Sequence, residues 1–191
     1  MEITRKIKLN KDFSELIVGD QFEIGALGKR FTATCHDIRD GEALIVFDEY
    51  VIDLPMNESG KNIGGFEESD LKDWLNSKFY STLDAEIKER VSGDIRIPTV
   101  EEVFGRNDYY ETSDYEQLPL MKERKNRLAF IRYEDGDEMW DWGWLMNRVK
   151  SSASNFANVD SVGCADYGYA SNSFGVRPAF YIRLKSADQT I

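Results

Sequence analysis

The chain has 191 residues, 41% of them hydrophobic, and a formal net charge of −11, which suits one domain with its own core. This acidic chain has no basic stripe that could neutralise phosphates. We therefore expect neither nucleic acid nor an anionic membrane surface as a partner. The chain as given shows no signal peptide and no transmembrane segment. Unless a signal peptide has been removed, we therefore expect a cytoplasmic or virion-associated protein without membrane insertion.

The first third of the chain predicts β structure. Residues 1–12 are polar and charged and indicate an N-terminal arm or an edge strand. From Phe13 to Pro55, short runs of β-branched and aromatic residues alternate with glycine turns, among them Asp40-Gly41. This pattern is typical of antiparallel strands that follow one another along the chain. Residues 56–65 predict a loop.

Three helices are predicted after residue 66. The first has Ser69 as a plausible N-cap and an apolar face with helical spacing: Leu71, Trp74, Leu75, Phe79. The second covers residues 81–91, where apolar residues recur every four positions. The third begins at Thr99, with Glu102 at the position of a capping box, and ends at Gly105.

The middle of the chain is polar. Residues 107–126 predict a long loop that carries Tyr109, Tyr110 and Tyr115, and a strand resumes at Leu128. An acidic turn at residues 134–141 has enough carboxylates to ligate calcium, but the EF-hand spacing is absent, which favours a solvated loop. No metal site is predicted.

Two cysteines, Cys35 and Cys164, lie far apart in the sequence, and neither belongs to a CxxC motif. The only histidine, His36, adjoins Cys35, but neighbouring residues of a strand point to opposite faces. A catalytic cysteine–histidine pair is therefore not expected, and no cofactor is predicted.

The stretch from Trp140 to Arg183 organises the rest of the chain. Trp140, Trp142 and Trp144 alternate with small or acidic residues, which predicts one buried aromatic ridge on an extended segment. A strand predicted at residues 174–183 contains Pro178, so it is either an edge strand or has an unpaired N–H side there. Arg177 lies among apolar residues and is interpreted as a structural clamp, with a ligand contact as the alternative.

Residues 151–174 differ from the rest in composition. Thirteen of these twenty-four residues are Ser, Asn, Asp or Tyr, and Lys, Arg and Glu are absent. An ordinary solvated hairpin would explain the pattern. The alternative is a recognition surface, because binding loops use Tyr for rigid contact area and Ser or Asn for adaptable hydrogen bonds. The residues predicted to present side chains on one exposed face are Asn155, Asn158, Asp166, Tyr167, Tyr169 and Asn172.

Four motifs occur in a fixed order: a Ser69–Asn76 helix, an Ile97–Glu102 helix start, Trp142–Leu145, and a Gly175–Phe180 ending of the form G-V-R-P-A-F. Over roughly residues 15–184 they resemble a bacterial and phage domain family with a C-terminal G-V-R-P-A motif. That family is similar to the C-type-lectin-like fold of formylglycine-generating enzymes and diversified receptor-binding proteins. Met146, Asn147 and Arg148 depart from the family's Arg-Ser-Pro.

The resemblance implies an α+β fold: a C-type-lectin-like domain with a twisted, mostly antiparallel sheet and two or three packed helices. Its expected extent is residues 13–184, followed by a C-terminal tail at residues 185–191. Trp74, Trp142, Trp144 and Arg177 are expected to be structural. Formylglycine-generating enzymes use a cysteine pair, whereas Cys164 has no partner nearby in the sequence, so their activity is not carried over.

The leading functional hypothesis is a non-catalytic recognition module that binds a glycan, a peptide or a protein through residues 151–174. The alternatives are a phage or cell-surface structural subunit, and an oxidase that depends on a metal or on Cys164.

Overall fold

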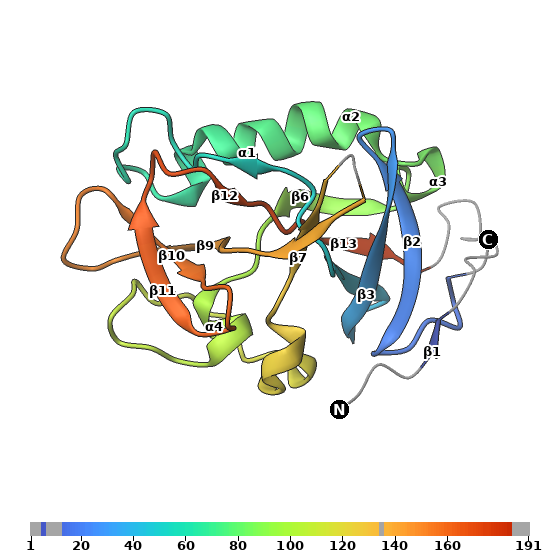
Figure 1. Ribbon diagram of the computed structural model, residues 1–191. Coiled ribbons are helices and arrows are strands. Elements are labelled where there is room, and N and C mark those ends of the chain that lie inside the picture. Colours follow the sequence, from blue (N-terminus) through green and yellow to red (C-terminus); the bar gives the residue numbers. More distant parts are fainter. Residues whose placement is uncertain (1–4, 7–12, 134–135, 185–191) are drawn as a thin grey trace.

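The computed structural model describes residues 5–6, 13–133 and 136–184. It has a mixed α+β fold with mostly antiparallel sheets, one main helix and several short helical turns (Figure 1). Most of the predicted N-terminal arm and all of the predicted tail at residues 185–191 lie outside the described residues. So do Glu134 and Asp135 of the acidic turn.

A six-stranded sheet has the order β1-β2-β3-β4-β13-β6. Its strands are β1 (Arg5–Lys6), β2 (Asp20–Ala26), β3 (Lys29–Arg39), β4 (Glu42–Phe47), β6 (Val91–Arg96) and β13 (Ala179–Arg183). All neighbours are antiparallel except β1 and β2. The predicted succession of strands is therefore confirmed in β2, β3 and β4. Two-residue turns with positive φ at Leu27-Gly28 and Asp40-Gly41 connect them, as tight hairpins require.

A five-stranded sheet has the order β11-β10-β9-β12-β5. Its strands are β5 (Asp53–Leu54), β9 (Gly143–Arg148), β10 (Asn155–Val159), β11 (Ala165–Tyr169) and β12 (Phe174–Gly175). Strands β7 (Phe130–Arg132) and β8 (Glu138–Trp140) form a separate hairpin.

The Tyr50 ring requires glycine at two paired positions of this second sheet. Gly143 and Gly175 are register partners across β9 and β12. A Cβ atom built on either glycine would lie 2.3 Å from the Tyr50 side chain, much closer than a real Cβ approaches another atom. The glycines of the W-G-W and G-V-R-P-A motifs thus make room for one buried ring.

The main helix runs along one side of both sheets (Figure 1). It comprises α1 (Asp70–Trp74), a π-helical turn η2 (Leu75–Phe79) and α2 (Tyr80–Thr82). The Ser69 hydroxyl accepts a hydrogen bond from the Lys72 N–H at 3.0 Å, as expected of an N-cap. Leu71, Leu75 and Phe79 are buried, whereas Trp74 is only half-buried, less than its predicted core position implies.

The second predicted helix is only partly confirmed. Leu83 has an extended backbone with ψ of 148°, which ends the main helix, so residues 81–91 contain the end of α2 and the separate short helix α3 (Ala85–Lys88). Val91 begins β6 instead. The third helix is confirmed: α4 (Val100–Phe104) has a complete Thr99–Glu102 capping box and ends at Gly105. The remaining helical turns are η1 (Phe66–Glu68), η3 (Pro119–Lys122) and η4 (Arg124–Asn126).

The predicted strand at residues 174–183 is divided between the two sheets. Its first part is β12 and its last part is β13, which lies between β4 and β6, so the edge-strand interpretation is wrong. Pro178 stands just before β13, and its carbonyl accepts a hydrogen bond from the Phe47 N–H at 3.0 Å. Because Pro178 lies outside the strand, its lack of an N–H removes no hydrogen bond from the ladder. The short segment Val176 to Pro178 therefore carries the chain from one sheet to the other.

The predicted ridge of three tryptophans is also wrong. Trp140 ends β8 and is 53% exposed, whereas β9 begins only at Gly143, so the three residues do not share one strand. Trp142 is half-buried. Trp144 alone is fully buried; its Nε1 donates to the Leu54 carbonyl at 2.8 Å, and its ring lies 4.6 Å from that of Phe174.

Candidate functional site

Strands β10 and β11 carry five of the six predicted binding residues, all except Asn172, and place them on two faces. Asn155 is the register partner of Tyr169, and Tyr167 is the partner of Ala157. Asn158 is the register partner of Asp166, one position further along, and therefore faces the opposite way. The expectation of a single exposed face is wrong, because successive residues of a strand alternate between its two sides.

Asn158 is not a surface residue at all. Its exposure is 0%, and neither atom of its side-chain amide has a hydrogen-bond partner within the described residues. The prediction rested on the rarity of short polar side chains in cores. That rule fails for Asn158 because β10 is an inner strand, flanked by both β9 and β11.

Asp166 and Asn172 serve the local backbone. The Asp166 carboxylate accepts the Tyr167 N–H at 2.8 Å, and its side chain is half-buried. Asn172, also half-buried, donates its backbone N–H to the Tyr169 carbonyl in the turn that follows β11. The two residues thus lie on either side of Tyr167 and Tyr169 along the chain, Asp166 near the start of β11 and Asn172 after its end.

Three exposed tyrosines gather beside β11: Tyr109, Tyr167 and Tyr169, with exposures of 46%, 43% and 62%. We call them the tyrosine surface. The rings of Tyr109 and Tyr167 are 5.6 Å apart, although the two residues are far apart in the sequence. The hydrogen bond between their hydroxyls, together with partial burial, raises the pKa of Tyr109. Asn155 lies on the same face of the sheet, opposite Tyr169.

Tyr110 anchors the loop that carries Tyr109. It is 3% exposed, its hydroxyl donates to the Asp166 carbonyl at 3.0 Å, and its ring meets that of Tyr109 edge-on at 5.1 Å. Burial raises the pKa of Tyr110 to about 12. Tyr115, the third tyrosine of the same loop, does not join the tyrosine surface; it lies over the Arg96 guanidinium, 4.6 Å from it.

Arg177 has the geometry of a clamp. Its guanidinium is buried and donates to the carbonyls of Phe47, Asn126 and Arg127 at 2.5, 3.2 and 3.3 Å. Its ion-pair partner is Asp48, with the Arg177 Nη2 atom 3.9 Å from the Asp48 carboxylate. Arg177 therefore ties η4 to the end of β4.

The two cysteines have different environments. Cys35 is buried in the main core, and its thiol pKa is raised to about 12, chiefly by desolvation, whereas Cys164 is exposed. Within the described residues, no group of three or more histidine, cysteine or acidic side chains is arranged to hold a metal ion. In the same part of the chain, no helix is long and apolar enough to cross a membrane.

Residues 40–184, about three quarters of the chain, match the family described as Domain of unknown function (DUF6273). The chain belongs to the DUF6273 family. No curated protein and no solved structure matches it. The matched part of the DUF6273 domain includes the main helix, the five-stranded sheet, the tyrosine surface and Arg177, whereas β1, β2 and β3 precede it.

Sequence reasoning missed one feature, a hollow beside β3 that is lined by Phe31, Glu49 and Arg132 among others. These residues come from three separated segments, and no motif joins them. In the sequence, Glu49 is one of two acidic residues, with Asp48, that follow the apolar run at residues 43–47, and such a pair is too common to identify a site.

Proposed function

We propose that this DUF6273 domain is a non-catalytic recognition module that binds a partner protein or a glycan through the tyrosine surface. The contact between Tyr109 and Tyr167 carries the proposal. It unites the segment at residues 151–174 with the long loop, and the buried Tyr110 fixes both. Exposed rings that are already held in place lose little conformational freedom on binding, which is why Tyr recurs in binding surfaces.

The proposal includes a finer assignment, a C-type-lectin-like domain related to diversified receptor-binding proteins. Its support is the order of the motifs and the position of the segment at residues 151–174, directly before the G-V-R-P-A ending. The mostly antiparallel α+β architecture agrees with such a domain. In this assignment, the sheets and the main helix form a framework, and β10, β11 and the loop at residues 107–116 carry the side chains that contact the partner.

The test pairs binding with stability for Tyr167→Ala and Tyr169→Ala. A glycan array and a cross-linking pull-down identify the partner, and its affinity for each variant is then measured by surface plasmon resonance. We expect each variant to bind about tenfold or more weakly, because binding hot spots concentrate in such aromatic residues. The melting temperature should change by less than about 3 °C, since ~1 kcal/mol is the scale for an exposed side chain in a domain of this size.

Tyr115→Ala is the matched control, because Tyr115 is also partly exposed but lies over Arg96 and away from the other three tyrosines. It should bind like the wild type. Wild-type affinity in both β11 variants would reject the tyrosine surface. A loss of binding that accompanies a large fall in melting temperature would make these tyrosines structural.

A further inference from the structure

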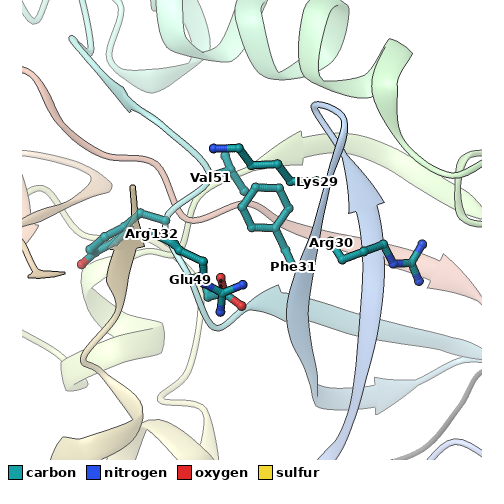
Figure 2. A pocket seen from close by; sticks show the side chains of 7 residues that line it. Lys29, Arg30, Phe31, Glu49, Val51 and Arg132 are labelled. Carbon is teal, nitrogen blue, oxygen red and sulfur yellow. Dashed lines mark ion pairs between the residues drawn. The ribbon is translucent and has the colours of Figure 1, made fainter. Parts of the chain in front are cut away.

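The hollow beside the start of β3 is remote in sequence from the segment at residues 151–174. Its volume is about 320 Å³, at the small end of the range for ligand pockets. Figure 2 shows its lining, which comes from β3, from the segment after β4 and from β7: Lys29, Arg30, Phe31, Glu49, Tyr50, Val51 and Arg132. A hollow of this size accommodates a metabolite rather than a folded partner.

Glu49 brings a buried carboxylate to this hollow. The residue is 2% exposed, and its Oε1 accepts the Thr32 N–H at 3.0 Å. Its Oε2 is buried and accepts no hydrogen bond within the described residues. Arg132 supplies the nearest cation, with its Nη2 atom 3.3 Å from Oε2, but the Arg132 side chain is 45% exposed. Because a buried carboxylate oxygen is costly without a donor, Oε2 favours a ligand that brings one.

Two cations lie on either side of the Phe31 ring. In Figure 2, Lys29 extends on one side of this ring, and Glu49 with Arg132 lies on the other. Lys29 has no ion-pair partner among the residues that the structure describes. Arg30 points away from the ring and pairs with Asp84 at 2.8 Å, so it does not contribute to the hollow. The apolar wall between the two charged ends is formed by Phe31 and Val51.

We infer that this hollow binds an acidic α-amino acid. Its ammonium group donates to Glu49 Oε2, and its α-carboxylate accepts from the Arg132 guanidinium, the side chain best suited to a planar two-oxygen group. Its methylene carbons lie along Phe31 and Val51, and its side-chain carboxylate meets Lys29. The two carboxylates and the ammonium of glutamate or aspartate thus match Lys29, Arg132 and Glu49 one to one, although Arg132 also pairs with Glu138, outside the lining, at 3.3 Å.

The experiment is isothermal titration calorimetry of the full chain with L-glutamate and L-aspartate as probes. Two further probes each remove one group: glutarate lacks the ammonium, and L-glutamine lacks the side-chain charge. We expect L-glutamate to bind, and glutarate and L-glutamine to bind about tenfold or more weakly than L-glutamate, as the loss of one charge-assisted hydrogen bond predicts.

The variants assign each contact. Glu49→Gln should weaken glutamate about 10- to 100-fold while leaving glutarate nearly unchanged, and Lys29→Met should reduce glutamate to the level of glutamine. Arg30→Met is the control and should bind like the wild type. The inference is overturned by no heat from either acidic amino acid at millimolar concentration, by equal binding of glutarate and glutamate, or by an unaltered Glu49→Gln variant. Because the first two outcomes come from the wild-type chain, a variant that fails to fold leaves the test decisive. Neither result depends on the tyrosine surface.

Discussion

Replacing Arg177 by Lys tests how η4 is held to the end of β4. Arginine donates from two nitrogen atoms to three carbonyls, those of Phe47, Asn126 and Arg127, and a lysine ammonium at the same position cannot span them. About two charge-assisted hydrogen bonds are lost, each worth roughly 1.5–3 kcal/mol. The expected loss of stability is about 3–5 kcal/mol, the range found when a buried charge loses its partners.

Urea unfolding at pH 7, followed by tryptophan fluorescence, measures this loss as a lower midpoint with an unchanged m-value. Arg30→Lys is the matched control, because its ion pair with Asp84 is about half-exposed and worth less than ~1 kcal/mol. Native-state hydrogen exchange should also locate the damage. The amides of η3 and η4 should lose protection first, since Arg177 holds the carbonyls at the end of η4.

An Arg177→Lys variant within about 1 kcal/mol of the wild type would refute this reasoning. It would mean that water satisfies the three carbonyls as well as the guanidinium does. A large loss of stability with unchanged protection of η3 and η4 would instead show that Arg177 acts through the main core alone.

Three further predictions concern tryptophan, tyrosine and histidine. Trp74→Ala should lower the free energy of unfolding by about 2–3 kcal/mol, less than the loss of a fully buried tryptophan, because Trp74 is half-buried and stacks on Phe79 at 5.8 Å. Trp140 is exposed, so Trp140→Ala should lower it by less than about 1 kcal/mol. Urea unfolding compares the two variants. Tyr110→Phe removes only the bond to the Asp166 carbonyl and should cost about 1 kcal/mol while weakening partner binding, which surface plasmon resonance measures. Burial, followed by the charge of Arg177, lowers the pKa of His36 from 6.5 to about 3. The contribution of neutral His36 to the free energy of unfolding is therefore complete above pH 6.5 and decreases as the pH falls toward 3. Near pH 5 this decrease is about 2 kcal/mol. Burial raises the pKa of Asp53 to about 6, so protonation of Asp53 adds stability below pH 6 and opposes the effect of His36. The measurement is therefore the difference between the urea midpoints of the wild type and His36→Gln, in which the effect of Asp53 cancels. This difference should become smaller from pH 7 to pH 5 if His36 is the cause.

Local signals in the sequence predicted local structure well. The Ser69 cap, the Thr99–Glu102 capping box and the glycine turns between β2, β3 and β4 each involve residues close in the chain, and each is present in the structure. The boundary of the second helix could not be predicted in this way. Residues 81–91 have an apolar period of four, but pairing of Val91 with Ile182 of β13 competes with helix formation there and prevails.

The candidate site depended on contacts that no local pattern encodes. Composition singled out the segment at residues 151–174, but the prediction of one exposed face ignored the alternation along β11, which places Tyr167 and Tyr169 on one face and Asp166 on the other. Whether a residue such as Asn158 is exposed depends on which strands flank β10, and that is a property of the whole sheet. The contribution of Tyr109 likewise required the path of a loop some fifty residues earlier, which short-range periodicity does not constrain.

The two proposed sites belong to different parts of the framework, and this division has a physical basis. The tyrosine surface lies along β11, at one edge of the five-stranded sheet, where the outer side of the strand is free of a neighbouring strand and large side chains reach solvent. The hollow beside β3 instead lies next to the six-stranded sheet and depends on Glu49, a charge buried near the chain's crossing into the second sheet. An exposed aromatic edge suits a large partner, and a buried carboxylate between two cations suits a small charged one. Tyr167→Ala should therefore weaken only the binding of the large partner, and Glu49→Gln only the binding of the acidic amino acid. In the double variant, each affinity should fall by the same factor as in the corresponding single variant, because sites without shared contacts act additively.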